Sequence, residues 1–154
     1  MRVDSATGVV QVLEIVAAHD CGTIINPLGA EGQIIGGVIM GVGQALTEGI
    51  QLTADGRQLN ADMLDYKLPT AADAPPVRVA WIQKPAPNAG PRGLKGVAEP
   101  PCVPTPGAIA NAIAAATGTR IRELPMTPVR VWRALDRALD TAGDAALGAP
   151  DGEA

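Results

Sequence analysis

Residues 84–102 read KPAPNAGPRGLKGVAEPPC and form the connection around which the rest of the chain is arranged. The stretch holds five prolines and three glycines before Cys102, and its only acid is Glu99. Pro100 disfavours the α-helical region for Glu99 and pushes it towards an extended backbone, while Pro101 stiffens the chain after it. Connections this long without secondary structure are usually either functional or disordered. Sparse charges, and helix signals directly afterwards, favour a functional loop.

The composition describes one globular domain. The chain has 154 residues, of which 47% are hydrophobic and 18% charged, enough for a real core. A net charge of −4 with scattered signs, and only three aromatic residues (Tyr66, Trp81 and Trp132), argue against nucleic-acid binding. The longest apolar stretch, residues 34–46, is shorter than the roughly 20 residues of a membrane-spanning helix, so no membrane span is predicted.

The first residues and the two cysteines indicate the cellular compartment. The opening MRVD lacks the apolar segment of a signal peptide. Cys21 and Cys102 fit no metal-binding spacing and need not pair, which suits a reducing compartment. We therefore expect a cytoplasmic protein, with export through a partner's signal left open.

Two elements are predicted in the first third of the chain. Residues 9–18, VVQVLEIVAA, follow the turn signal Thr7-Gly8 and predict a buried strand entered through a hairpin-like turn. Asn26 and Pro27 supply a helix cap and a first helical residue, so a helix should run from about Pro27 or Ala30 to Leu46. Five glycines, each costing about 1 kcal/mol relative to Ala, interrupt this helix: Gly32, Gly36, Gly37, Gly41 and Gly43. Their spacing indicates either tight packing of a buried helix or close approach of another backbone or a flat ligand.

The middle of the chain predicts short extended segments. Residues 49–52 are a candidate strand, followed by an Asp55-Gly56 turn, and the alternation in residues 77–82 predicts a second strand.

The last third predicts two helices. Thr105 is the expected cap of a helix that starts at Pro106 and stops at Gly118, residues 123–125 should be extended, and Thr127 should cap the last helix. The last helix is expected to bury Val131, Leu135 and Leu139 and to expose Arg130, Arg133, Asp136 and Arg137. Residues 1–140 would then form the domain and residues 141–154 a disordered tail. Interleaved strands and helices predict an α+β, mixed layered domain.

Few residues are suited to catalysis. Ser5 and His19 are the only Ser and His, so no hydrolytic triad is expected. His19 and Cys21 could share a strand face as an imidazole and thiolate pair, although a strand-end His bonded to backbone is more common. The spacing of His and Cys supplies no zinc site, and the glycines match no dinucleotide fingerprint.

Three polar residues remain as candidates. Glu99 is a lone carboxylate in an apolar, proline-fixed loop, the type of group whose pKa desolvation raises towards that of a useful base; a surface Glu is the alternative. Gln33 lies in an apolar helix and needs partners for its amide if it is buried. Lys95 is either an anion contact or a salt-bridge partner.

Several segments together resemble a known family. HDCGTIINPLGAEGQIIGGVIMGVGQAL, LPTAADAPPVRVAWIQKPAP, GLKGVAEPP and ELPMTPVRVWRAL resemble, in order and spacing, the C-terminal part of the molybdenum-binding large subunit of the xanthine dehydrogenase and aldehyde oxidase family. The similarity extends from Val9 to Leu139. It implies a fragment of the molybdopterin-binding domain, in a subunit several times longer.

The resemblance also implies roles. Glu99 corresponds to the base that deprotonates a water-derived oxygen at molybdenum, which then attacks an aldehyde or N-heterocycle. Gln33 corresponds to a residue against the molybdopterin, and the backbone of Lys95, Gly96, Val97 and Ala98 to a segment approaching the cofactor. Ala98 replaces the glycine that is usual before the base. No protein ligand to the metal is implied.

The implied enzyme is an oxidoreductase, active only with partners. Molybdenum-molybdopterin would be shared with the rest of the large subunit, while iron-sulfur clusters and FAD would belong to partner chains: an iron-sulfur subunit and, where present, a FAD subunit. The alternative is a non-catalytic, truncated remnant or subunit-interaction module of the same fold.

Overall fold

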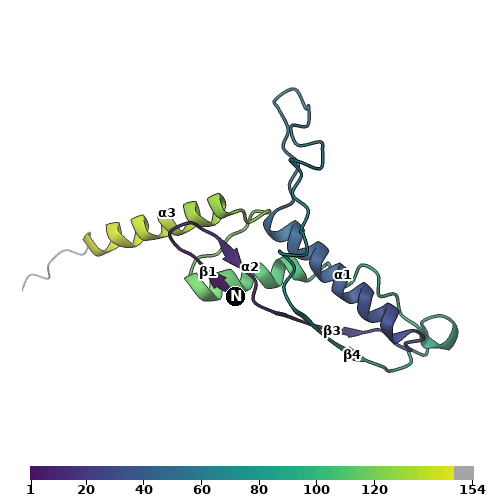
Figure 1. Ribbon diagram of the computed structural model, residues 1–154. Coiled ribbons are helices and arrows are strands. Elements are labelled where there is room, and N and C mark those ends of the chain that lie inside the picture. Colours follow the sequence, from purple (N-terminus) through teal and green to yellow (C-terminus); the bar gives the residue numbers. More distant parts are fainter. Residues whose placement is uncertain (148–154) are drawn as a thin grey trace, which may run out of the picture.

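The computed structural model describes residues 1–147 and confirms the mixed α+β class. Figure 1 shows the arrangement of the elements. In chain order they are β1 (Arg2–Val3), β2 (Val10–Gln11), β3 (Ile15–Asp20), α1 (Pro27–Leu46), β4 (Val77–Ile82), the 3₁₀ turn η1 (Pro91–Gly93), α2 (Thr105–Thr117) and α3 (Pro128–Leu147). Among these residues no helix is long and apolar enough to cross a bilayer.

The strands form two small sheets. β1 and β2 pair antiparallel, and Gly8, at φ +73°, occupies the turn between them. β3 and β4 pair parallel, in a register from Ile15 opposite Val77 to Asp20 opposite Ile82. The single buried strand predicted for residues 9–18 is therefore wrong: it is divided into β2 and β3, which belong to different sheets, and its residues alternate between covered and exposed.

Helix α1 begins at the earlier of its two predicted starts, Pro27, ends at Leu46 as predicted, and contributes to two cores. The Asn26 Oδ1 atom accepts a hydrogen bond from the Gly29 N–H at 3.1 Å, which confirms the cap. One core lies between α1 and the parallel sheet and consists of Ala17, Cys21, Ile34 and Val38. The other joins α1 to both later helices and consists of Val42, Ala45, Ile109, Ile113, Met126, Val131 and Leu135.

The glycines of α1 divide by their surroundings. A Cβ at Gly37 would lie 3.0 Å from Pro101 Cβ, and one at Gly41 would lie 2.6 Å from Thr105 Cβ. Gly32 and Gly36 are exposed and have no atom within 4 Å of such a Cβ. Close backbone approach is thus confirmed at two positions, on the side of α1 that faces the start of α2.

Thr105 is not the cap of α2. The helix begins at Thr105 itself, Pro104 stands at the cap position without a side-chain bond, and the Thr105 hydroxyl donates to the Pro101 carbonyl at 2.9 Å. The compact contact with α1 holds this hydroxyl in the interior, away from the free N–H groups of the first turn. The predicted stop is confirmed, since Gly118 ends α2 in the left-handed region at φ +73°.

Helix α3 confirms its cap and part of its buried stripe. The Arg130 N–H donates to the Thr127 hydroxyl at 3.4 Å, and Val131 and Leu135 are buried. Leu139 is 72% exposed, contrary to expectation, because α3 projects away from the body of the molecule (Figure 1). The helix continues to Leu147, beyond the expected start of a tail at residue 141, and residues 148–154 lie outside the described part. Residues 123–125 form bends, not the extended segment predicted.

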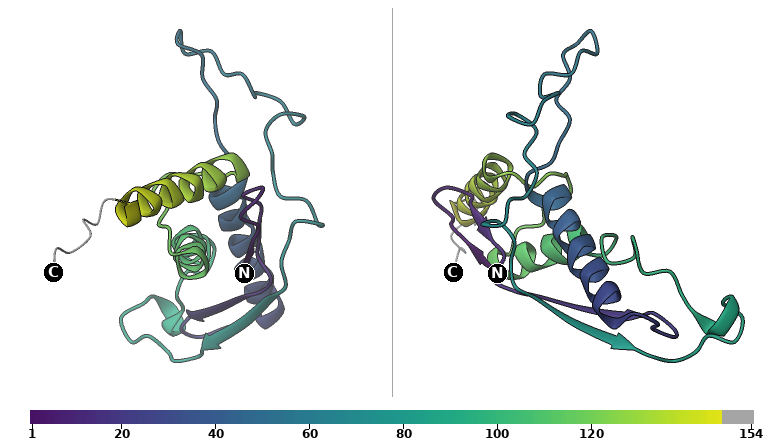
Figure 2. Two further views of the ribbon diagram at one scale, coloured as in Figure 1. Left: turned by 90° about the vertical axis from the view of Figure 1, so that its left-hand side faces the viewer. Right: turned by 45° about the vertical axis from the view of Figure 1, so that its right-hand side comes forward.

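Between α1 and β4 the chain forms a long arm that stands out from the body (Figure 2). Asn60, 5% exposed, ties its base: Nδ2 donates to the Gly49 carbonyl at 2.7 Å and Oδ1 accepts from the Gln51 N–H at 2.9 Å. The Asp55-Gly56 turn is confirmed, with Gly56 at φ +84°. In place of the strand predicted at residues 49–52 there is a single bridge between Leu52 and Gln58.

Candidate functional site

The predicted functional loop is anchored at the carboxyl end of β3. Gly22 and Leu94 form an antiparallel bridge, the Thr23 N–H donates to the Gly93 carbonyl at 3.0 Å, and the Lys95 N–H donates to the Cys21 carbonyl at 3.1 Å. A Cβ at Gly22 would lie 2.3 Å from the Gly93 carbonyl oxygen, so only glycine permits this approach. The loop is therefore held to the sheet directly before the segment that carries Glu99.

Lys95 forms an ion pair with Asp20, the last residue of β3. The hydrogen bond that the Lys95 ammonium donates to the Asp20 carboxylate, and a second one from the Gly22 N–H, hold the pKa of Asp20 below its usual value. Of the two predicted roles, the salt bridge is the one observed. Its effect is to fix the side chain of Lys95 at the strand end.

The segment after Lys95 follows the first half of α1. Val97 packs against the core cluster that contains Ile34, and Pro101 lies against Gly37. Gln33 is one helical turn before Gly37 and so shares its side of α1. The stretch between Val97 and Pro101, which carries Glu99, therefore runs beside the first half of α1.

The two candidate side chains are both exposed. Glu99 is open to solvent, and its backbone carbonyl accepts a hydrogen bond from the Cys102 N–H at 2.9 Å. Gln33 is exposed on α1, and Gly96 and Ala98 are exposed beside Glu99. The apolar enclosure expected for Glu99, and the burial considered for Gln33, are therefore not provided by residues 1–147.

The weaker candidates do not form a site. Cys21 is buried, and burial together with the nearby charge of Asp20 raises the pKa of its thiol, the opposite of what a nucleophilic thiolate needs. Cys102 is also a buried free thiol and donates to the Gln44 Oε1 atom at 3.4 Å. Residues 1–147 contain no group of three or more His, Cys, Asp or Glu residues placed to hold a metal ion.

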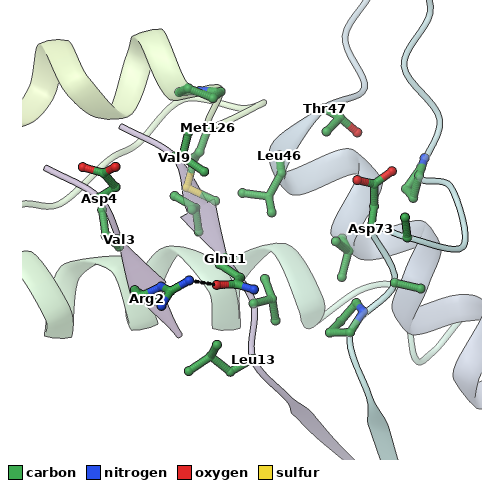
Figure 3. A pocket seen from close by; sticks show the side chains of 18 of the residues that line it. Arg2, Val3, Asp4, Val9, Gln11, Leu13, Leu46, Thr47, Asp73 and Met126 are labelled. Atoms are coloured by element: carbon green, nitrogen blue, oxygen red, sulfur yellow. Dashed lines mark hydrogen bonds between the residues drawn. The ribbon is translucent and has the colours of Figure 1, made fainter. Parts of the chain in front are cut away.

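A cavity of about 850 Å³ lies elsewhere, between the β1–β2 hairpin, the end of α1 and the segment before β4 (Figure 3). None of the candidate residues lines it. Its charged groups are engaged with neighbours: Arg2 bonds to Gln11, Asp4 accepts from the Ala6 N–H, and Asp73 accepts from Thr70. The volume alone therefore does not make this hollow a reaction site.

Sequence reasoning missed the docking of residues 92–95 onto residues 20–23. The Thr23 hydroxyl donates to the Arg92 carbonyl at 2.6 Å, and Arg92 itself has φ +62°, a conformation that few residues other than glycine adopt. Gly22 and Gly93 were visible in the sequence as glycines next to the two motifs. Their pairing is a contact over about seventy positions, which local patterns do not show.

Comparisons with known proteins agree on one family. A family model described as the molybdopterin cofactor-binding domain matches residues 1–75. The xanthine dehydrogenase molybdenum-binding subunit of Escherichia coli O157:H7 is 42% identical over 133 residues, which cover 86% of this chain and 18% of that protein. The nicotine 6-hydroxylase large subunit of Paenarthrobacter nicotinovorans is 36% identical over 146 residues, covering 93% and 18%.

Solved structures give the same result. Quinoline 2-oxidoreductase from Pseudomonas putida 86 superposes with a TM-score of 0.81 at 34% identity, covering 87% of this chain and 17% of that one. Aldehyde oxidoreductase from Desulfovibrio gigas superposes with a TM-score of 0.78 at 36% identity, covering 87% and 14%. The chain thus spans less than a fifth of the length of these relatives. It belongs to the xanthine dehydrogenase and aldehyde oxidase family, as part of the molybdopterin-binding domain of the molybdenum-binding large subunit.

Proposed function

We propose that this chain carries the catalytic base and part of the cofactor contacts of a molybdenum hydroxylase, which hydroxylates an aldehyde or an N-heterocycle with water-derived oxygen. The observation that supports this most is the position of residues 95–99. Backbone bonds and the Lys95–Asp20 ion pair hold them at the carboxyl end of the parallel β3–β4 pair, with Glu99 exposed. Such strand ends are the usual place for ligands in parallel sheets.

The exposed residues fit a flat, polar cofactor such as molybdopterin. Gln33 offers both amide donors and an amide acceptor, and open glycines at positions 32 and 36 leave the adjoining helix surface free of side chains. Gly96 is equally open, so the backbone beside it can be approached closely. When bound, the molybdenum cofactor would supply a Lewis acid and a two-electron redox centre. Gln33 would bind the pterin, and Gly96, Val97 and Ala98 would contact the cofactor through their backbone.

Glu99 would accept the proton of the water-derived nucleophile. Its carboxylate is held on a backbone fixed by Pro100 and Pro101, of which Pro101 is fully buried. Lys95 would position the segment that leads to Glu99, because its ammonium group is paired with Asp20 at the end of β3. Ala98 places a methyl group next to the base, on a side that is exposed in this chain. The enclosure that would desolvate Glu99 would come from the rest of the subunit.

The activity would require assembly. Because the chain spans 14–18% of the relatives named above, most of the molybdenum-binding subunit lies outside these 154 residues. We propose that the assembled enzyme also has an iron-sulfur subunit and, in some assemblies, a FAD subunit to carry electrons away, and that it works in the cytoplasm. The same short span supports one alternative, a non-catalytic module that keeps the fold and never holds the cofactor.

The test of the proposed function is Glu99→Gln in the assembled enzyme, purified with the chains that accompany it from its native host. Turnover of aldehydes and purines should fall by a factor of about 10² to 10⁴, while molybdenum and pterin content stay at the wild-type ratio. Glu123→Gln, an exposed Glu paired with Arg130, is the matched control and should keep its turnover. Turnover of Glu99→Gln within a few-fold of wild type would refute the role of Glu99. Absence of molybdenum and pterin from the wild-type assembly would favour the non-catalytic alternative.

A further inference from the structure

Within residues 1–147, strand β3 has one strand partner and one free edge. Ile15 lies opposite Val77, and its N–H donates to the Pro76 carbonyl at 3.0 Å. In a parallel pair, residues that bond to the neighbouring strand alternate with residues whose N–H and C=O groups face the other way. The backbone groups of Ile15, Ala17 and His19 therefore face β4, and those of Val16 and Ala18 face away. Among residues 1–147 the sheet has two strands, so this second set has no strand partner.

The free edge opens into a groove of about 430 Å³ between β3 and α2. Six consecutive residues, 14–19, line one wall, as happens where a strand presents its edge and not one face. The opposite wall is α2, with the small residues Ala108 and Ala112 beside Ile109. Val38 of α1 and Pro101 also line the groove, which is mostly apolar. Of its polar residues, Glu14 is paired with Arg78 and the Thr105 hydroxyl donates to the Pro101 carbonyl.

The outer face of the sheet is uncovered and mostly apolar, with the ion-paired Arg78 and Asp20 as its charged residues. Val16 is 58% exposed and Ile82 is 61% exposed, and Ala18 and Ala80 lie exposed between them in register. α1 covers the other face of the sheet. Parallel sheets normally have both faces covered, and their strands are almost continuously apolar. A two-stranded parallel pair with one open face and an open edge is therefore an incomplete sheet.

We propose that a strand from the remainder of the molybdenum-binding subunit, apolar on the side that faces α2, pairs with the free edge of β3 and fills this groove. The proposal rests on the proposed function only in requiring that this chain assembles with that remainder. The occupant follows from length, since the relatives extend over more than five times the span matched here. β3 has six residues, so a strand of about six residues would match it. Its side chains facing the groove would be apolar, because they meet Val38 and Ile109.

Hydrogen–deuterium exchange of the native assembly tests this, with fragmentation that resolves single residues. Ala17 and His19 are internal controls, because their amides face β4 whether or not the edge is occupied. If a strand is added, the Val16 and Ala18 amides will exchange at least about 100-fold more slowly than open amides, as the controls do. Fast exchange at Val16 and Ala18 beside slow exchange at Ala17 and His19 would overturn the proposal.

A photo-reactive amino acid at position 16 identifies the occupant. Cross-links to a segment of the remaining molybdenum-binding subunit, whether joined to this chain or encoded separately, support the proposal, and cross-links to a second copy of this chain contradict it. The same reagent at position 57, an exposed site on the arm, controls for non-specific capture. The two proposals fail separately: an active, molybdenum-loaded enzyme with fast exchange at Val16 and Ala18 refutes the added strand alone. Protected amides in an assembly without molybdenum refute only the catalytic role.

Discussion

Gly41 of α1 and Thr105 of α2 lie so close that a Cβ built on Gly41 would stand 2.6 Å from Thr105 Cβ and 2.9 Å from the Cys102 carbonyl oxygen. Real side chains do not tolerate such separations, so this contact depends on glycine. One turn earlier, Gly37 meets Pro101 in the same way. The two contacts fix residues 101–105 along α1, and with them the chain that leads from Glu99.

Gly41→Ala should destabilise the fold by about 1–3 kcal/mol, because the new methyl group forces α1 and α2 apart. This loss should exceed the gain in helix propensity. Gly36→Ala is the matched control: its Cβ meets nothing within 4 Å, so the same change should raise the free energy of unfolding by up to about 1 kcal/mol. Urea unfolding followed by circular dichroism measures both. Equal effects of the two substitutions would contradict the close approach at Gly41.

Thr105→Val should lower the free energy of unfolding by about 1–3 kcal/mol. The buried Thr105 hydroxyl donates to the Pro101 carbonyl at 2.9 Å, and valine keeps the shape but leaves that carbonyl without its donor. Thr105→Ser keeps the hydroxyl and should retain the hydrogen bond, losing only a methyl group. A lower urea midpoint for Thr105→Ser than for Thr105→Val would show that packing of the methyl group, not the hydrogen bond, stabilises this contact.

Lys95→Met should raise the pKa of Asp20 towards its ordinary value of about 3.9, because the largest stabilising partner of the carboxylate is removed. Since the folded state lowers this pKa, the contribution of the pair to stability is present above the ordinary value and is lost as pH falls through the folded value. Carboxyl ¹³C shifts, followed by NMR between neutral and acid pH, measure the change. Lys84→Met should have a much smaller effect, because its charge contributes least. A larger shift with Lys84→Met would show that the ion pair is wrongly assigned.

Tyr66 should ionise above its ordinary value of about 10, because its hydroxyl donates to Glu48 Oε2 at 3.1 Å and the carboxylate favours the protonated phenol. The stabilisation is present below pH 10 and is lost as pH rises through the raised value. Tyr66 is the only tyrosine, so absorbance at 295 nm reports it alone. Glu48→Gln should lower the midpoint. An unchanged midpoint would mean that the base of the arm is not held by this bond.

Sequence reasoning succeeded where a signal is local. The Asn26-Pro27 cap, the Thr127 cap, the stop at Gly118 and the strand at residues 77–82 depend on neighbouring residues, and each is present. The prediction of one strand at residues 9–18 was wrong because the apolar pattern does not reveal that β2 and β3 join different sheets. The predicted burial of Leu139 was wrong because helical spacing predicts an apolar stripe along a helix but not the point where the helix leaves its core.

For the candidate site, the sequence identified the residues but not their surroundings. Gln33 and Glu99 were found from composition and from the family's motifs, together with the proline-fixed geometry of the loop. Their surroundings were not predictable: both are exposed, because the groups that would enclose them do not belong to residues 1–147.

By itself the sequence determined the helix ends, the main strand segments and the family, because caps, turns, periodicity and motif order are properties of short stretches. Only the tertiary structure decided that Lys95 pairs with Asp20, that Gly37 and Gly41 admit the chain at residues 101–105, and that one edge of β3 has no strand partner within residues 1–147. These are contacts over tens of residues. Their geometry is set by how α1 is placed between the sheet and α2, and no local pattern encodes that placement.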